Sequence, residues 1–167
     1  MKTLRFLSTL FAILLVIPLT NAQSGETITP NALFKELRKI ENASYTNISS
    51  VMMTMARAMT SGDEKSFLEN IKSMRIITFN DCSASDVEQV ANRLRTIEFK
   101  DYEPGVTTTE GNTEMRVFIK TKGDEVKEII IATLIENNVT LMQINGNLSI
   151  EDLEKLSKSN PIQQPTQ

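Results

Sequence analysis

The chain has 167 residues, a formal net charge of −3 at pH 7, one Cys, no His and no Trp. The missing His excludes Ser-His-Asp and Cys-His catalytic arrangements, and the lone Cys82 excludes Cys-rich zinc sites, CxxC redox pairs and an internal disulfide. We therefore expect no metal site and no cofactor. A chain of this length suits one domain with one core.

The first 22 residues have the parts of a secretory signal peptide. Lys2 and Arg5 precede an apolar stretch at 6–19, and Thr20-Asn21-Ala22 resembles a small-residue cleavage site. The apolar stretch is shorter than the ~20 residues that a spanning helix needs, so we expect no stable membrane span after cleavage. The sequence therefore predicts an exported protein, periplasmic or extracellular, that begins near Gln23.

Charge also limits the partners of the exported chain. Without the signal peptide it would keep 16 basic and 21 acidic residues, a net charge of −5, with no block of like charge. This balance argues against nucleic acid as a partner and against a cationic helix that binds anionic lipid.

A helix, a strand and a Met-rich helical segment are the first predicted elements. Thr29 and Pro30 have the residue types of an N-cap and a first helical position, and residues 44–50 favour a strand. The helical segment after that strand contains four Met residues within eight positions: Met52, Met53, Met55 and Met59. They form either an adaptable binding surface or core beneath the sheet, and we favour the core.

A strand and a capped helix follow. The β-branched and aromatic residues 75–79 predict the strand. Ser85 and Glu88 have the spacing of a capping box, which predicts the start of the helix, and residues 96–100 predict a short strand. Cys82 lies between the 75–79 strand and the helix, and we expect it to be a small buried hydrophobe rather than a reactive thiol.

Residues 101–113 have no apolar periodicity and predict a long loop. The loop holds an exposed aromatic ring, Tyr102, beside Glu103 and Glu110. It is either a loop that contacts a ligand or partner or a plain hairpin connection, and we favour the connection. With Asp101 and Glu114 at its ends, it also brings together the carboxylates that a hydrolase of the glycosidase type would need.

The stretch 114–156 predicts a meander of three strands and a closing helix. Its middle strand, 126–135, is apolar on both faces, which is typical of a central strand, although an edge strand that pairs between chains is the alternative. Asn137-Asn138 predicts a tight turn, Asn145-Gly146-Asn147 the end of the sheet, and Ser149 the cap of the closing helix.

Together these elements predict an α+β fold: a single, largely antiparallel sheet with a C-terminal three-strand meander and several helices packed on it. We expect one α+β domain at 23–160, between the signal peptide at 1–22 and a disordered tail at 161–167.

Several segments resemble one known family. They are LFKEL, SSVMM, SMRIITF, KGDEVKEIII and NNVTLMQINGNLSIEDLEKLSK, and the resemblance covers roughly 30–158. The family comprises small exported proteins of Bacteroidetes-type bacteria, domain of unknown function 4252. The resemblance implies an α+β protein of the periplasm or envelope, near envelope signalling systems. Many such proteins look like lipoproteins, but this chain lacks a lipobox Cys. The family offers no catalytic residues.

These observations favour an exported envelope protein that is a non-catalytic binding or interaction module, with an unidentified envelope protein or ligand as its partner. The alternatives are an envelope-stress or signalling accessory and a carboxylate-dependent hydrolase. Two segments are candidates for the functional surface, the 101–113 loop and the Met52–Met59 segment.

Overall fold

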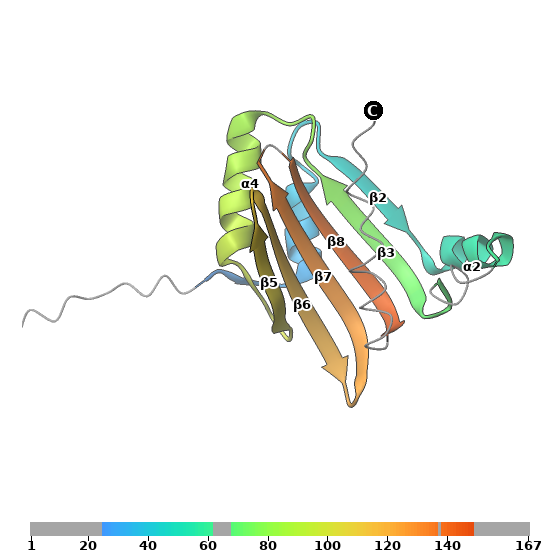
Figure 1. The fold of residues 1–167 in the computed structure, drawn as a ribbon. Helices are drawn as coiled ribbons and strands as arrows, with labels where there is room; N and C mark the ends of the chain where they lie inside the picture. Colours follow the sequence, from blue (N-terminus) through green and yellow to red (C-terminus); the bar gives the residue numbers. More distant parts are fainter. Residues whose placement is uncertain (1–24, 62–67, 137, 149–167) are drawn as a thin grey trace, which may run out of the picture.

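A computed structural model describes residues 25–61, 68–136 and 138–148, and it confirms the α+β fold (Figure 1). The helices within these ranges are α1 (Pro30–Leu37), α2 (Ser50–Met59) and α4 (Ala84–Thr96). The strands are β1 (Thr27–Ile28), β2 (Ser44–Ile48), β3 (Ile71–Thr78), β4 (Glu98–Phe99), β5 (Glu103–Glu110), β6 (Thr113–Lys122), β7 (Glu125–Ile135) and β8 (Asn138–Leu148).

In the described part of the chain, one antiparallel sheet has the spatial order β2-β3-β8-β7-β6-β5. The predicted meander of β6, β7 and β8 is confirmed. Because β7 pairs with β6 on one side and β8 on the other, the alternative in which it is an edge strand is wrong. The short strands β1 and β4 form a separate parallel pair, which joins the chain before α1 to the chain after α4.

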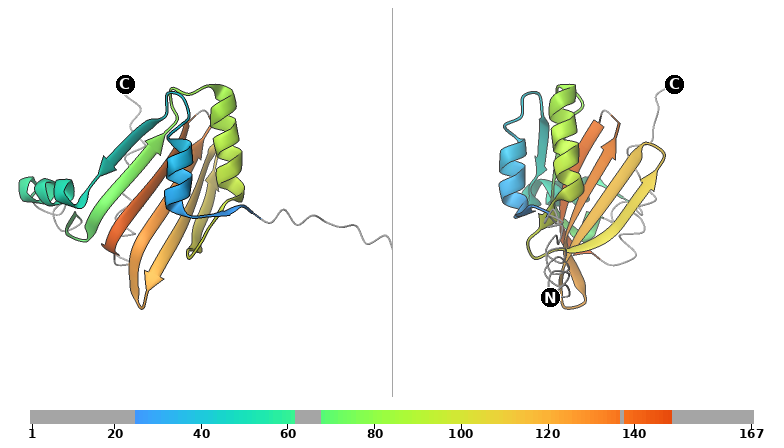
Figure 2. Two further views of the ribbon diagram at one scale, coloured as in Figure 1. Left: turned by 180° about the vertical axis from the view of Figure 1, so that it is seen from behind. Right: turned by 90° about the vertical axis from the view of Figure 1, so that its left-hand side faces the viewer.

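Helices α1 and α4 cover one face of the sheet (Figure 2). Each begins with a hydroxyl cap: Thr29 Oγ1 accepts from the N–H of Ala32 at 3.4 Å, and Ser83 Oγ accepts from the N–H of Asp86 at 3.2 Å. The predicted cap at Ser85 therefore lies two residues too late. The main core lies between these helices and the sheet, and its largest buried side chains include Leu33, Phe34, Ile77, Phe79, Leu94, Ile97, Ile130 and Leu141.

A second apolar cluster lies on the opposite face, around Ile129 and Ile144. Burial of Ile129 and Ile130 to 1% and 0% exposure confirms that β7 is covered on both sides. Helix α2 adds one side chain to the second cluster, Met53, which is 2% exposed.

The prediction that the Met-rich segment fills the core is right for Met53 and wrong for its neighbours. Helix α2 extends past the ends of β2 and β3 (Figure 1), so one side of it meets the sheet. At about 100° per residue, four of its apolar positions fall on the side away from Met53. We call them the α2 stripe: Val51, Met52, Met55 and Met59, exposed by 68%, 57%, 57% and 87%.

Residues 101–113 do not form the predicted loop. Most of them form the edge strand β5, which pairs with β6 and has a register shift between Pro104 and Thr107. All eight residues of β5 are exposed, so the segment lacks the apolar alternation that marks a half-buried strand. Gly111, with a φ of +56°, makes the turn into β6.

Two boundaries in the meander also differ from the prediction. Strand β8 passes through Gly146 and ends at Leu148, and Asn138, predicted to lie in the turn, is already the first residue of β8 and pairs with Ile135. The predicted signal peptide, closing helix and C-terminal tail lie outside the described residues.

Candidate binding site

Polar side chains occupy inward positions on the helix-covered face of the sheet. Gln143 pairs with both Ile130 and Arg75, and Arg75 also pairs with Asn47. Directly paired residues point to the same face, and Ile130 belongs to the core beneath the helices, so the polar residues face that side too. The next row on this face consists of Lys120, Glu128, Asn145 and Ser73.

Arg75 is half-buried, and the side chains to which it donates are neutral. Its Nε donates to Gln143 Oε1 at 2.7 Å, and its Nη2 donates to Asn31 Oδ1 at 2.8 Å. Its guanidinium carbon lies 4.1 Å from the ring centroid of Phe34, which fixes the group by a cation–π contact. Burial lowers the pKa of Arg75, but a guanidinium stays protonated at any physiological pH.

Gln143, only 4% exposed, connects Arg75 to a carboxylate. Its Nε2 donates to Glu128 Oε2 at 2.8 Å, and the hydroxyl of Tyr102 donates to the same oxygen at 2.5 Å. Lys120 Nζ lies 3.8 Å from the other oxygen of Glu128. Glu128 is therefore neutralised and hydrogen-bonded within the network. Burial, followed by donation to Glu128, raises the pKa of Tyr102 well above its ordinary value of 10.0.

A depression of about 280 Å³ opens beside this network. We call it the Arg75 pocket; its polar lining consists of Asn31, Asn47, Ser73, Arg75, Glu128, Gln143 and Asn145. Within it Asn145 Nδ2 donates to Ser73 Oγ at 2.9 Å. Arg75 and Glu128 are its only charged members, and the remaining five polar side chains are amides or a hydroxyl, which can both donate and accept.

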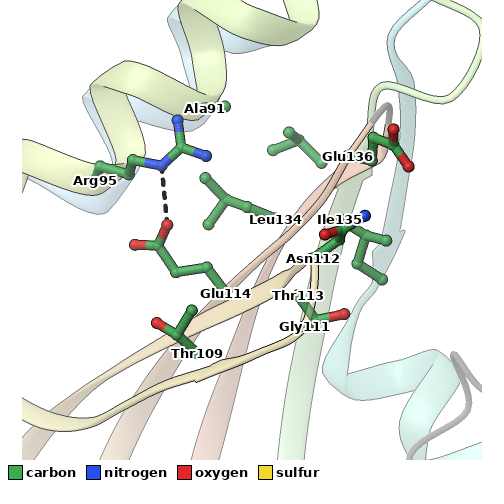
Figure 3. A pocket seen from close by; sticks show the side chains of 11 residues that line it. Ala91, Arg95, Thr109, Gly111, Asn112, Thr113, Glu114, Leu134, Ile135 and Glu136 are labelled. Atoms are coloured by element: carbon green, nitrogen blue, oxygen red, sulfur yellow. Dashed lines mark hydrogen bonds and ion pairs between the residues drawn. The ribbon is translucent and has the colours of Figure 1, made fainter.

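A second depression, of about 360 Å³, lies between α4 and the turns at the other end of the sheet (Figure 3). Arg95 of α4 forms an ion pair across it with Glu114 of β6 at 2.8 Å. Glu136 also lines this Arg95 pocket, but it points away from the ion pair (Figure 3). Each charged group at the centre of the Arg95 pocket is thus already compensated.

Three of the carboxylates considered for a hydrolase, Glu103, Glu110 and Glu114, do not gather at one site. Glu103 and Glu110 are exposed at opposite ends of β5, and the seven residue steps between them span ~23 Å, far beyond the few ångströms of a glycosidase pair. Glu114 pairs with Thr109, so it lies on the opposite face from Glu110.

Of the three residues predicted for a partner loop, the structure brings only Tyr102 to the Arg75 network. It is half-buried rather than exposed, and its ring centroid lies 5.8 Å from that of Phe99. Glu103 and Glu110 remain exposed on the edge strand and contact neither pocket. A contact between this edge and a partner stays a prediction.

Sequence reasoning missed Arg75, Gln143 and Glu128, although the sequence contains a signal for each. Each of the three lies two positions from a core residue of the same strand, and therefore on the same face. Arg75 precedes Ile77, Glu128 precedes Ile130, and Gln143 follows Leu141. Polar residues in phase with core positions are candidates for a buried polar network.

Other candidate chemistry finds little support in the described residues. Cys82 packs against the main core, and burial, with the nearby Asp86 and Asp81, raises the pKa of its thiol, which makes a nucleophilic thiolate unfavourable. The described ranges contain no group of three or more Cys, Asp or Glu side chains placed to hold a metal ion. They also contain no helix that is both long and apolar enough to cross a membrane.

The fold and the pocket define a small α+β protein with an open antiparallel sheet and helices on one face. The chain belongs to the DUF4252 family, since the family model, described as a domain of unknown function, matches residues 34–156. The matched range includes Arg75, Tyr102, Glu128 and Gln143. No curated protein and no solved structure matches the chain.

Proposed function

We propose that this chain is an exported, non-catalytic binding module of the cell envelope, and that the Arg75 pocket is its ligand site. The observation that carries the proposal is the placement of a guanidinium without a contacting carboxylate and four neutral polar side chains on the core-facing side of the sheet, with a fifth, Asn31, facing them from α1. Polar groups at such positions cost stability unless they are paired, and an apolar core would need none of them. A bound solute gives them a role.

The pocket proposal can be tested with the mature chain, 23–167, and a thermal-shift panel of neutral sugars, sugar acids and amino acids. Ser73→Leu should fill the pocket, while Ser44→Leu places the same side chain on the opposite face of the edge strand β2. We expect at least one solute to raise the melting temperature of the wild type and Ser44→Leu, but not of Ser73→Leu. A panel without effect on the wild type would overturn the proposal.

Export is tested separately. Expressed from its full gene in a bacterial host, the chain should be recovered from the periplasm or medium with a mass that corresponds to a start near Gln23. Recovery of the complete chain, Met1 included, from the cytoplasm would contradict this part of the proposal.

A signalling-accessory role is the second candidate, and the α2 stripe favours it. Four large apolar side chains on one exposed helix face are suited to contact with another protein, and Met adapts to irregular surfaces. Deletion of the gene should then change envelope-stress transcription, and Met55→Lys with Met59→Lys in the chain should reproduce the deletion. An unchanged transcript profile in the deletion strain would count against this role.

A further inference from the structure

We propose, on the basis of the binding function above, that the Arg75 pocket selects a small monoanionic carboxylate that also carries hydroxyl groups, of the chemical class of sugar acids. The carboxylate would lie against Arg75, and the hydroxyls would lie along the amide and hydroxyl groups of β2, β3 and β8.

The charge requirement follows from the partners of Arg75. No carboxylate oxygen of the described residues lies within 4.0 Å of its guanidinium, whereas Arg93 and Arg95 each form ion pairs. The bonds to Gln143 and Asn31 use two of its five N–H donors, the Tyr45 hydroxyl is a further partner, and all three partners are uncharged. A half-buried cation with free donors and no carboxylate in contact is a group with which an anionic ligand pairs well.

Glu128 supplies only part of the counter-charge, because it favours the Arg75 cation from a distance and does not form an ion pair with it. One of its oxygens accepts from Tyr102 and Gln143, and the other lies near Lys120, so its own charge is already compensated. Arg75, Glu128 and Lys120 together leave one excess positive charge. One excess positive charge matches one negative charge on a ligand, and the second charge of a dianion such as phosphate would have no cation to pair with and would lie beside the Glu128 carboxylate that lines the same pocket.

The rest of the lining sets the polarity and size of the ligand. Asn31, Asn47, Ser73 and Asn145 are neutral and can each donate and accept, which matches hydroxyl groups. Asn31 stands in the first turn of α1, so the positive end of that helix also borders the pocket. A volume of about 280 Å³ lies at the lower limit of the ~300–1,000 Å³ typical of ligand sites, so the ligand is one small molecule.

The direct test is calorimetric titration of the mature wild-type chain with D-glucuronate, D-glucose and inorganic phosphate. We expect glucuronate to bind, and glucose to bind about tenfold to a hundredfold more weakly, the factor that corresponds to one charge-assisted hydrogen bond. Phosphate should also bind more weakly than glucuronate. Equal affinities for glucuronate and glucose, or tighter binding of phosphate, would overturn the inference.

Asn47→Asp tests the charge requirement while Arg75 itself stays in place. Asn47 is exposed and pairs directly with Arg75, so the introduced carboxylate supplies the missing counter-ion and repels the ligand. We expect this variant to melt at the wild-type temperature or above and to lose glucuronate binding. Asn112→Asp, the same change at an exposed position of the Arg95 pocket, should keep the wild-type affinity. Loss of affinity in both variants, or in neither, would contradict the inference.

The outcomes separate this inference from the proposed function. Binding of glucose that Ser73→Leu abolishes would keep the Arg75 pocket as a ligand site and reject the carboxylate. Absence of binding by any solute, in calorimetry and in the thermal-shift panel, would reject both.

Discussion

Arg75 and Gln143 face each other across β3 and β8, and Nε of Arg75 donates to Oε1 of Gln143 at 2.7 Å. The same Gln143 side chain donates to Glu128, so one neutral amide separates a cation from an anion that would otherwise be direct partners. Gln143 thereby positions Arg75 and keeps it out of direct contact with the Glu128 carboxylate.

Gln143→Met should destabilise the fold strongly because it keeps the volume of the side chain but removes its hydrogen bonds, including those with Arg75 and Glu128. With Arg75 and Glu128 each losing a buried partner, we expect a decrease of about 2–4 kcal/mol in the free energy of unfolding, measured in urea. Gln89→Met makes the same change on the exposed side of α4, where a loss below about 0.5 kcal/mol is expected. Equal losses in the two variants would mean that the network contributes nothing.

Met53 and Met55 give a matched comparison on α2. Met53 is 2% exposed and Met55 is 57% exposed. Met53→Ala should lower the free energy of unfolding by about 2–5 kcal/mol through lost burial and a cavity, while Met55→Ala should stay within about 0.5 kcal/mol. Chemical denaturation of both variants checks this, and a large loss for Met55→Ala would show that the α2 stripe is covered in solution.

Gly146 allows a close approach between β8 and the chain just before β3. A Cβ at this position would lie 2.1 Å from the carbonyl oxygen of Asn70, which itself accepts from the N–H of Asn147 at 2.9 Å. Gly146→Ala should therefore lower the free energy of unfolding by about 1–3 kcal/mol or more.

The control for Gly146 is Gly111, which has a φ of +56° and open space around it. Asn tolerates this left-handed conformation, so Gly111→Asn should stay within about 1 kcal/mol of the wild type. A harmless Gly146→Ala would mean that Asn70 moves away freely.

The raised pKa of Tyr102 predicts that the stability of the fold depends on pH in the alkaline range. The pKa of its hydroxyl is raised above 10.0 in the folded chain, so above about pH 10 the unfolded chain loses this proton while the folded chain keeps it. The folded state then binds more protons, and the contribution of Tyr102 to stability falls as the pH rises.

The stability difference between the wild type and Tyr102→Phe should therefore be constant below pH 9 and should shrink at higher pH. Urea unfolding of both chains between pH 7 and pH 11 measures it. A difference that stays constant across that range would place Tyr102 in contact with solvent.

The sequence predicted the parts of this fold whose side chains report burial directly. The apolar run around Ile129 predicted a central strand, and Thr29 with Pro30 predicted the start of α1, because these residue types have strong local preferences. Strand β5 escaped prediction because both of its faces are exposed, so nothing in its Thr-rich sequence alternates. It is a strand through its hydrogen bonds to β6, which depend on the rest of the sheet.

The candidate site was harder to predict because its residues are distant in sequence. Arg75 and Gln143 are 68 positions apart, and only the antiparallel register of β3 and β8 places them together. The Met-rich segment shows the opposite difficulty. Its spacing indicated an apolar helix face, but the spacing does not say whether that face meets the core, and α2 extends past the sheet that would have covered it.

The α2 stripe also determines which methionines of this protein are most accessible to oxidants. Thioethers convert to sulfoxides where they are accessible, and Met52, Met55 and Met59 are accessible while Met53 is enclosed. Peroxide would therefore react first with side chains whose oxidation leaves the core packing intact. It would turn an apolar helix face into a polar one, so a partner that depends on the stripe would be lost before the fold is.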